Sequence, residues 1–122
     1  MGSVESYRDL RIWQESIDLA KQIYALVDRL PAKELYGLRS QMTRSVVSIA
    51  ANIAEGSRRR KTPDLIHFLS MAHGSLAELE THLTIGIAVG YFDEAACAQS
   101  FDAAQAISRG IKKLIQTLEV KA

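Results

Sequence analysis

Apolar residues recur at spacings of three and four along most of the chain, which is the period of an α-helix and not of a strand. The first such seam consists of Leu10, Trp13, Ile17, Ala20, Tyr24 and Val27. Pro31 predicts the end of this helix, because proline inside a helix removes a hydrogen bond and clashes with the preceding turn. Trp13 and Tyr24 are expected to be core aromatic residues.

A second helix is predicted from about Glu34 to Glu55 or slightly beyond. Its apolar stripe consists of Leu35, Leu38, Met42, Val46, Ile49 and Ile53. Gly56 and Ser57 are suitable stop residues, since glycine tolerates the left-handed conformation found at many helix ends.

Two further helices follow in the second half of the chain. Thr62 is expected to cap the third, with Pro63 at its first position and Asp64 near the positive end of the helix dipole. Gly90 is expected to end it, and Asp93 to cap the fourth helix. The two seams consist of Leu65, Leu69, Ala72, Leu76, Leu79 and Leu83, and of Cys97, Phe101, Ala104, Ile111, Ile115 and Leu118.

Short connections between the four segments favour antiparallel neighbours. We therefore predict an all-α fold, an antiparallel up-down-up-down four-helix bundle that forms one domain over residues 1–122. Gly74 and Gly86 lie inside the third helix, where close approach of another helix would explain them. No apolar run reaches the length of a membrane span and no signal-peptide pattern is present, so we expect a cytoplasmic protein.

The second helix carries an unusual narrow polar stripe, formed by Gln41, Ser45, Ser48, Asn52, Glu55 and Arg59. Apolar residues flank the stripe on both sides, whereas an ordinary surface helix has one apolar arc. The stripe is either a tolerant exposed face or part of a contact in which Val47, Ala51 and Ala54 bury against another subunit. The subunit interface predicted on this second interpretation comprises Arg44, Val47, Ser48, Ala51, Asn52, Ala54 and Glu55. Glu55 is expected to pair with Arg59, four residues later, or with Arg44 of a neighbouring subunit.

Charge is strongly segregated, although the net charge is only +1. Residues 1–61 carry +4, residues 62–108 carry −6 without a single Lys or Arg, and residues 109–122 carry +3. The predicted topology brings the first residues, the loop after the second helix and the last residues to one end of the bundle. Such a basic end suits nucleic acid bound through its phosphates, without sequence readout. The expected nucleic-acid-binding residues are Arg8, Arg11, Arg58, Arg59, Arg60, Lys61, Lys112 and Lys113.

Several motifs resemble those of a known bacterial family. They are Tyr7-Arg8-Asp9-Leu10 with Trp13-Gln14, Tyr36-Gly37-Leu38 with Ser40-Gln41, Ser48-Ile49, Asn52-Ile53-Ala54-Glu55-Gly56, Phe68-Leu69, Gly74-Ser75-Leu76 with Glu78-Leu79-Glu80, and Gly90-Tyr91. The chain resembles the four-helix-bundle proteins encoded in intervening sequences of bacterial large-subunit ribosomal RNA. Asp64-Leu65 and Val89 depart mildly from the family pattern.

The resemblance implies a homo-oligomer, with a pentameric barrel as the expected form. It also implies kinship with the accessory protein of diversity-generating retroelements, which is similar in fold and binds nucleic acid and a reverse transcriptase. It implies no assigned biochemical activity.

The residues offer little for catalysis. His67 and His73 lie on different sides of one predicted helix, and no Glu-x-x-His pair of a di-iron bundle occurs. Arg60 and His67 only loosely match the Arg-x(4–6)-His signature of small helical RNases, and Cys97 lies on an apolar seam. We predict a protein that is not an enzyme and uses no cofactor or metal. Three hypotheses remain, namely an oligomeric nucleic-acid-binding protein, an interaction scaffold or accessory subunit for a nucleic-acid enzyme, and a small metal-independent RNase.

Overall fold

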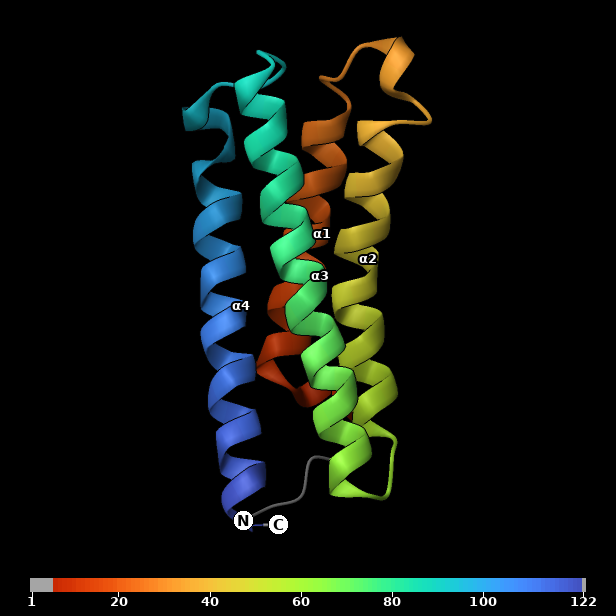
Figure 1. Ribbon diagram of the computed structural model, residues 1–122, viewed down its shortest axis with the longest axis vertical. Helices are drawn as coiled ribbons and strands as arrows, with labels where there is room; N and C mark the ends of the chain where they lie inside the picture. The colour runs from red at the N-terminus through yellow and green to blue at the C-terminus, as the bar shows by residue number, and fades with distance from the viewer. Residues whose placement is uncertain (1–5, 122) are drawn as a thin grey trace.

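The structure is a computed structural model that describes residues 6–121. The described chain contains four α-helices and two short 3-10 helices. These are η1 (Tyr7–Asp9), α1 (Arg11–Val27), η2 (Ala32–Glu34), α2 (Leu38–Ser57), α3 (Thr62–Ala88) and α4 (Glu94–Lys121). The chain alternates direction from each helix to the next (Figure 1). The predicted all-α four-helix bundle, with its up-down-up-down course, is therefore confirmed.

Two predicted helix starts are wrong. α2 begins at Leu38 instead of about Glu34, because Pro31 is followed by the separate turn η2. Leu35, which was assigned to the apolar stripe, lies outside α2 and is 50% exposed. Thr62 is already helical, and Lys61 is the N-cap residue of α3 without a side-chain cap.

Other predicted helix boundaries are confirmed. Asp93 caps α4, since its Oδ1 accepts a hydrogen bond of 2.7 Å from the backbone N–H of Ala96. Gly90 follows the end of α3 with a φ of +86°, a left-handed conformation that favours glycine.

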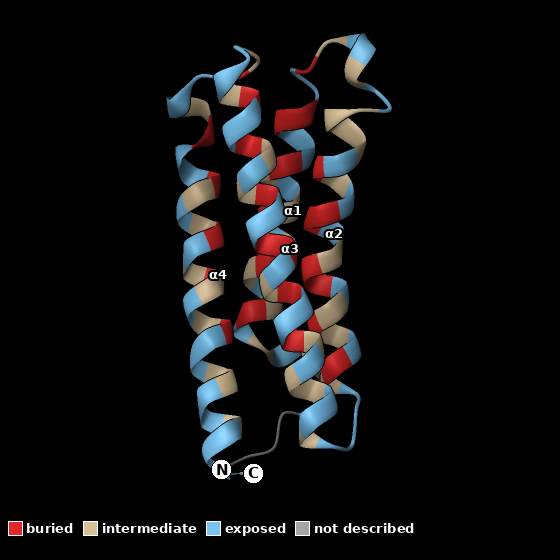
Figure 2. Ribbon diagram, viewed as in Figure 1, coloured by how far each residue is buried: buried red, intermediate tan, exposed pale blue. Residues whose placement is uncertain are grey.

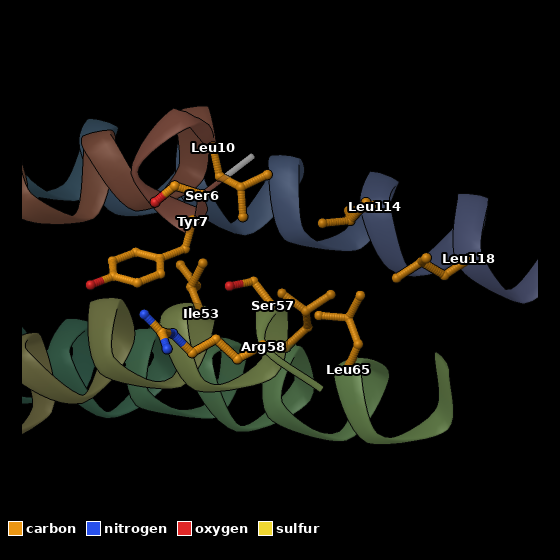
Figure 3. Close-up of a pocket in the computed structure, with 10 residues that line it drawn as sticks. Ser6, Tyr7, Leu10, Ile53, Ser57, Arg58, Leu65, Leu114 and Leu118 are labelled. Carbon is orange, nitrogen blue, oxygen red and sulfur yellow. The ribbon is translucent and has the colours of Figure 1, made fainter. Parts of the chain in front are cut away.

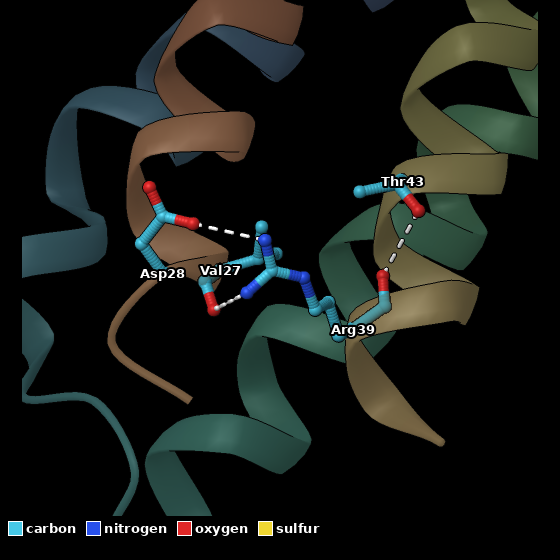
Figure 4. A network of polar contacts seen from close by, with 4 residues as sticks. All are labelled: Val27, Asp28, Arg39 and Thr43. Carbon is cyan, nitrogen blue, oxygen red and sulfur yellow. Dashed lines mark hydrogen bonds and ion pairs between the residues drawn. The ribbon is translucent and has the colours of Figure 1, made fainter. Parts of the chain in front are cut away.

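Arg39 fixes the C-terminus of α1, where carbonyl groups lack helical partners. Its guanidinium group donates to the Val27 carbonyl oxygen at 3.3 Å and to Asp28 Oδ1 at 2.9 Å (Figure 4).

The apolar seams meet along the bundle axis, where buried residues line the inner faces of the helices (Figure 2). Each helix contributes fully buried side chains, among them Leu19, Ile23, Met42, Ile49, Ile53, Leu76, Leu79, Leu83, Cys97, Ile107 and Ile111. Trp13 packs against this core as predicted, but Tyr24 is 50% exposed. The Tyr24 prediction is wrong because Ile23 occupies the core, which turns the next residue outward by about 100°.

Ser45 and Ser48, from the middle of the polar stripe of α2, lie against α3 in the same chain. The Ser75 hydroxyl donates to Ser48 Oγ at 2.9 Å, and Asn52 Nδ2 donates to the same oxygen at 2.9 Å. Ser45 Oγ lies 3.4 Å from His82 Nδ1, also across the α2–α3 contact. Small polar side chains therefore let these two helices pack closely while their hydroxyl groups remain hydrogen-bonded.

The prediction that another helix closely approaches Gly74 and Gly86 of α3 is wrong. Gly74 is exposed, and a Cβ atom there would meet nothing within 4 Å in this chain. Gly86 does have a close neighbour, but it is the ring of Phe92 from the loop between α3 and α4, 2.5 Å from such a Cβ.

In the part of the chain described, no helix is long and apolar enough to cross a membrane.

Candidate nucleic-acid interface

Three distant parts of the sequence meet at one end of the bundle. They are η1 with the start of α1, the four-residue loop between α2 and α3, and the end of α4 (Figure 1). Their proximity is direct, because Tyr7, Arg58 and Leu118 line one cavity. We call this the basic end and define it by residues 6–15, 55–64 and 109–121. These segments hold ten Lys or Arg residues and five Asp or Glu residues.

The cavity at the basic end has a volume of about 560 Å3. It exists because α1 begins only at Arg11, whereas α4 continues to Lys121, so the last turns of α4 extend past the start of α1. Its walls are mostly leucine and isoleucine side chains, with hydroxyl groups and one guanidinium group added by η1 and the end of α2 (Figure 3). The lining residues are Ser6, Tyr7, Leu10, Ile53, Ser57, Arg58, Leu65, Leu69, Leu114 and Leu118.

Arg8 and Arg58 are held against aromatic rings at this cavity. The guanidinium carbon of each lies 5.7 Å from the centre of the Tyr7 ring, and that of Arg8 lies 5.8 Å from the Trp13 ring. The two rings contact edge to face, with centroids 5.3 Å apart. These cation–π contacts restrict two arginines that would otherwise move freely.

The Arg59 guanidinium group makes two contacts within the chain. It lies 4.9 Å above the Phe68 ring centre, and its Nη2 is 3.3 Å from Glu55 Oε2. The predicted pairing of Glu55 with Arg59 is confirmed. Both side chains are about half exposed, so the pair contributes little to stability, on the order of 0.3–0.5 kcal/mol.

The remaining predicted binding residues are exposed. Arg60 and Lys61 lie in the loop between α2 and α3, and Lys112 and Lys113 follow the buried Ile111 on α4. Arg11 pairs with Glu15, with 3.6 Å between Nε and Oε2. The carboxylates of Asp9, Asp64 and Glu119 also belong to the basic end, which keeps an excess of positive charge.

Sequence reasoning missed Arg109. A groove between α1 and α4 is lined by Arg11, Arg109 and Lys113 together with apolar residues of both helices. Arg109 and Lys113 are four residues apart, the spacing that places two side chains on one helix face. That spacing was visible in the sequence and could have indicated the extension of the basic end along α4.

The residues of the predicted subunit interface divide into two groups. Ser48 and Asn52 are bonded within the chain, as described above, and Ala54 is half-buried. Arg44, Val47, Ala51 and Glu55 are exposed, and Val47 retains 48% of its surface. Since Ser48 faces Ser75, the exposed residues beside them form the outer side of the α2–α3 pair. Its apolar members are Val47 and Ala51 on α2 and Met71 on α3, with Gly74 beside them.

Groups suited to other chemistry are dispersed. Among residues 6–121 no cluster of three or more His, Cys, Asp or Glu residues could hold a metal ion. His73 Nε2 lies 2.8 Å from Ser108 Oγ and links α3 to α4. Cys97 is buried, and desolvation by that burial raises the pKa of its thiol.

The fold and charge arrangement define a class of protein, a compact antiparallel four-helix bundle with one basic end. Within that class, the chain belongs to the 23S rRNA-intervening sequence protein family, whose model matches residues 8–113. The fold is similar to that of a protein of unknown function from the S23 ribosomal protein family of Bacteroides thetaiotaomicron VPI-5482, solved by crystallography. The two share 24% sequence identity with a TM-score of 0.79, covering 85% of this chain and 97% of that one. A comparison with curated proteins finds no match.

Proposed function

We propose that the protein is a non-enzymatic binding module that contacts nucleic acid through the basic end. The observation that carries the proposal is the meeting of three sequence segments rich in Lys and Arg around one end, while residues 62–108 contain no Lys or Arg. The residues proposed to bind are Arg8, Arg11, Arg58, Arg59, Arg60, Lys61, Arg109, Lys112 and Lys113.

Electrostatics favours phosphate as the group bound. Lys and Arg side chains that neutralise phosphates release condensed counterions, and this term supplies most of the affinity of sequence-independent binding. The planar guanidinium group can donate two hydrogen bonds to one phosphate. The arginines held against Tyr7, Trp13 and Phe68 lose less conformational entropy on binding than free side chains would.

We also propose that the protein acts as a homo-oligomer, for which the family resemblance implies five copies. Support comes from the exposed apolar side of the α2–α3 pair, where Val47 and Met71 retain 48% and 44% of their surface. A closed ring would repeat the basic end around a symmetry axis and multiply the local positive potential.

Salt dependence tests the nucleic-acid proposal. The affinity of fluorescein-labelled RNA and DNA is measured by anisotropy over a series of salt concentrations. We expect a linear log–log dependence with a slope of about −0.7 to −0.9 per phosphate neutralised. The triple variant Arg58→Gln, Arg59→Gln, Arg60→Gln should bind more weakly and give a shallower slope with every sequence tested.

A matched control removes the same charge elsewhere. Lys21→Gln, Arg29→Gln and Lys33→Gln together also remove three positive charges, from exposed positions outside the basic end. This control should bind like the parent protein. Equal effects of the two triple variants would mean that net charge, and not the basic end, governs binding.

Two results would favour the other functions. If the parent binds no nucleic acid at low salt, the interaction scaffold or accessory subunit becomes the better account. Cleavage of labelled RNA in the presence of a chelator would instead indicate the small RNase.

A further inference from the structure

The basic end also gathers aromatic rings, which backbone neutralisation alone does not require. Within residues 6–121 the structure has four cation–π contacts, and all of them lie at this end. Tyr7 takes part in two of the four and also contacts Trp13 edge to face.

Tyr7 is held in place from several directions. The backbone N–H of Arg8 donates to Ser6 Oγ at 3.1 Å, and Gln14 Nε2 donates to the Arg8 carbonyl oxygen at 2.8 Å. These bonds fix η1 against α1, and the Tyr7 ring lies at the cavity beside the guanidinium group of Arg58 (Figure 3). The Tyr7 ring and the guanidinium groups of Arg8 and Arg58 therefore gather three flat groups beside an apolar recess.

We propose that Tyr7, Arg8, Arg58 and the adjoining cavity form a site for an unpaired nucleobase, so that the basic end prefers single-stranded to double-stranded nucleic acid. This inference rests on the function proposed above and specifies its ligand.

Shape and chemistry both favour a single strand. Unpaired bases stack on aromatic rings and on guanidinium planes, whereas the bases of a duplex are already stacked on one another. The cavity volume of about 560 Å3 lies within the usual range of small-molecule sites, about 300–1,000 Å3, so a base has room to enter. The Ser6 hydroxyl, whose oxygen accepts from the Arg8 N–H, can still donate to a base edge, and the Ser57 hydroxyl, which donates to the Ala54 carbonyl oxygen, can still accept from one. The surrounding basic residues hold the backbone.

The test separates base stacking from phosphate binding. Three probes with equal numbers of phosphates per strand are compared at several salt concentrations, namely a single-stranded RNA, the same length of abasic strand, and the RNA in a duplex with its complement. The unmodified protein should bind the base-bearing single strand at least about fivefold more tightly than either other probe, the factor that one stacked base supplies. This difference should persist at high salt, because stacking releases no counterions.

Substitutions at Tyr7 assign the effect to the site. Tyr7→Leu should remove the single-strand preference, and Tyr7→Phe, which keeps the ring, should retain it. Tyr24→Leu is the matched control, because Tyr24 is a half-exposed tyrosine of α1 that does not line the cavity. Circular dichroism checks that each variant is folded, and the comparison of the three probes on the unmodified protein stands even if Tyr7→Leu is not.

Each outcome has one meaning. Equal binding of the three probes overturns the nucleobase site but leaves phosphate binding at the basic end intact. Absence of binding to all three overturns both proposals. A folded Tyr7→Leu variant that weakens binding of all three probes equally also overturns the nucleobase site, because Tyr7 would then act only by positioning arginines.

Discussion

Single side chains connect parts of the bundle that lie far apart in sequence, and Glu34 is the clearest case. Its Oε1 accepts a hydrogen bond of 2.9 Å from the Leu38 backbone N–H, and its Oε2 accepts one of 2.8 Å from the Tyr91 hydroxyl. The carboxylate therefore accepts a hydrogen bond from a backbone N–H at the start of α2 and also holds the loop between α3 and α4. The bond from Leu38, followed by that from Tyr91, lowers the pKa of Glu34, and the same carboxylate raises the pKa of Tyr91.

This arrangement predicts that part of the stability depends on pH. The folded state lowers the pKa of Glu34, so its contribution is complete above the ordinary value of 4.5 and is lost as pH falls through the lowered value. We expect Glu34→Gln to lower the free energy of unfolding near neutral pH, and the difference from the parent to shrink in acid. Urea unfolding at several pH values measures this. Glu78→Gln, at an exposed site on α3, serves as the control, and a difference that grew in acid would contradict the prediction.

Cys97 is predicted to be protected from thiol reagents. It is completely buried, so a reagent cannot reach it, and burial raises the pKa of its thiol, so less of the reactive thiolate forms. Modification by an aromatic disulfide should be about a hundredfold slower or more in the native protein than in denaturant, because it requires the helices to open. Following the release of coloured thiolate with time measures this rate. Rapid stoichiometric labelling of the native protein would show that α4 opens readily.

At the scale of the helices, the hydrophobic pattern predicted the features that depend on which residues are buried. In each helix, apolar residues such as Leu76 in α3 and Ile49 in α2 recur every three or four positions and face the core. The existence and order of all four helices therefore followed from the sequence. The start of α2 did not follow, because the pattern of Leu35 and Leu38 continues unbroken through a turn made by Pro31 and Glu34. Likewise, the sequence did not show that the stripe of Ser45, Ser48 and Asn52 packs against α3, because spacing along one helix does not say which other helix lies opposite it.

The candidate site was predictable to a similar degree. Topology alone brought the basic segments of the two ends and the α2–α3 loop together, because antiparallel helices return the chain to the same end. The contacts of Arg8 and Arg58 with Tyr7 and the cavity behind them were not predicted. They depend on where η1 crosses the bundle, which no periodic pattern specifies.

The two glycines inside α3 give a matched pair of predictions. Gly86→Ala would place a Cβ atom 2.5 Å from the buried ring of Phe92, so we expect a loss of about 1–3 kcal/mol through overpacking. Gly74→Ala meets nothing in the chain and removes the entropic cost of glycine in a helix, so we expect a gain of about 0.5–1 kcal/mol. Urea unfolding at one fixed protein concentration measures both. Destabilisation by Gly74→Ala would indicate a contact with another molecule over this position.

At the scale of the whole molecule, the charge and apolar surfaces occupy different places. Positive charge gathers at the basic end, where the three segments meet. The exposed apolar side chains of Val47 and Met71 lie instead along the side of the bundle formed by α2 and α3. A copy of the chain can therefore pack against this side without covering the basic end. The two proposed activities, self-association and nucleic-acid binding, are compatible on one molecule and separable by mutation.

The last prediction tests self-association at this side. Sedimentation equilibrium of the parent at micromolar concentration should give a mass well above the 13.5 kDa of one chain, with five copies as the expected number. Ala51→Glu should shift the mass toward the monomer, because an unpaired charge buried in the contact costs several kcal/mol. Ala51 is exposed within the single chain, so the fold itself should tolerate the substitution and retain its helical circular dichroism. Ala25→Glu makes the same change at an exposed site on α1 and should leave the mass unchanged. A parent that sediments only as a monomer refutes self-association, whereas an Ala51→Glu variant that assembles like the parent shows that the contact lies on another face.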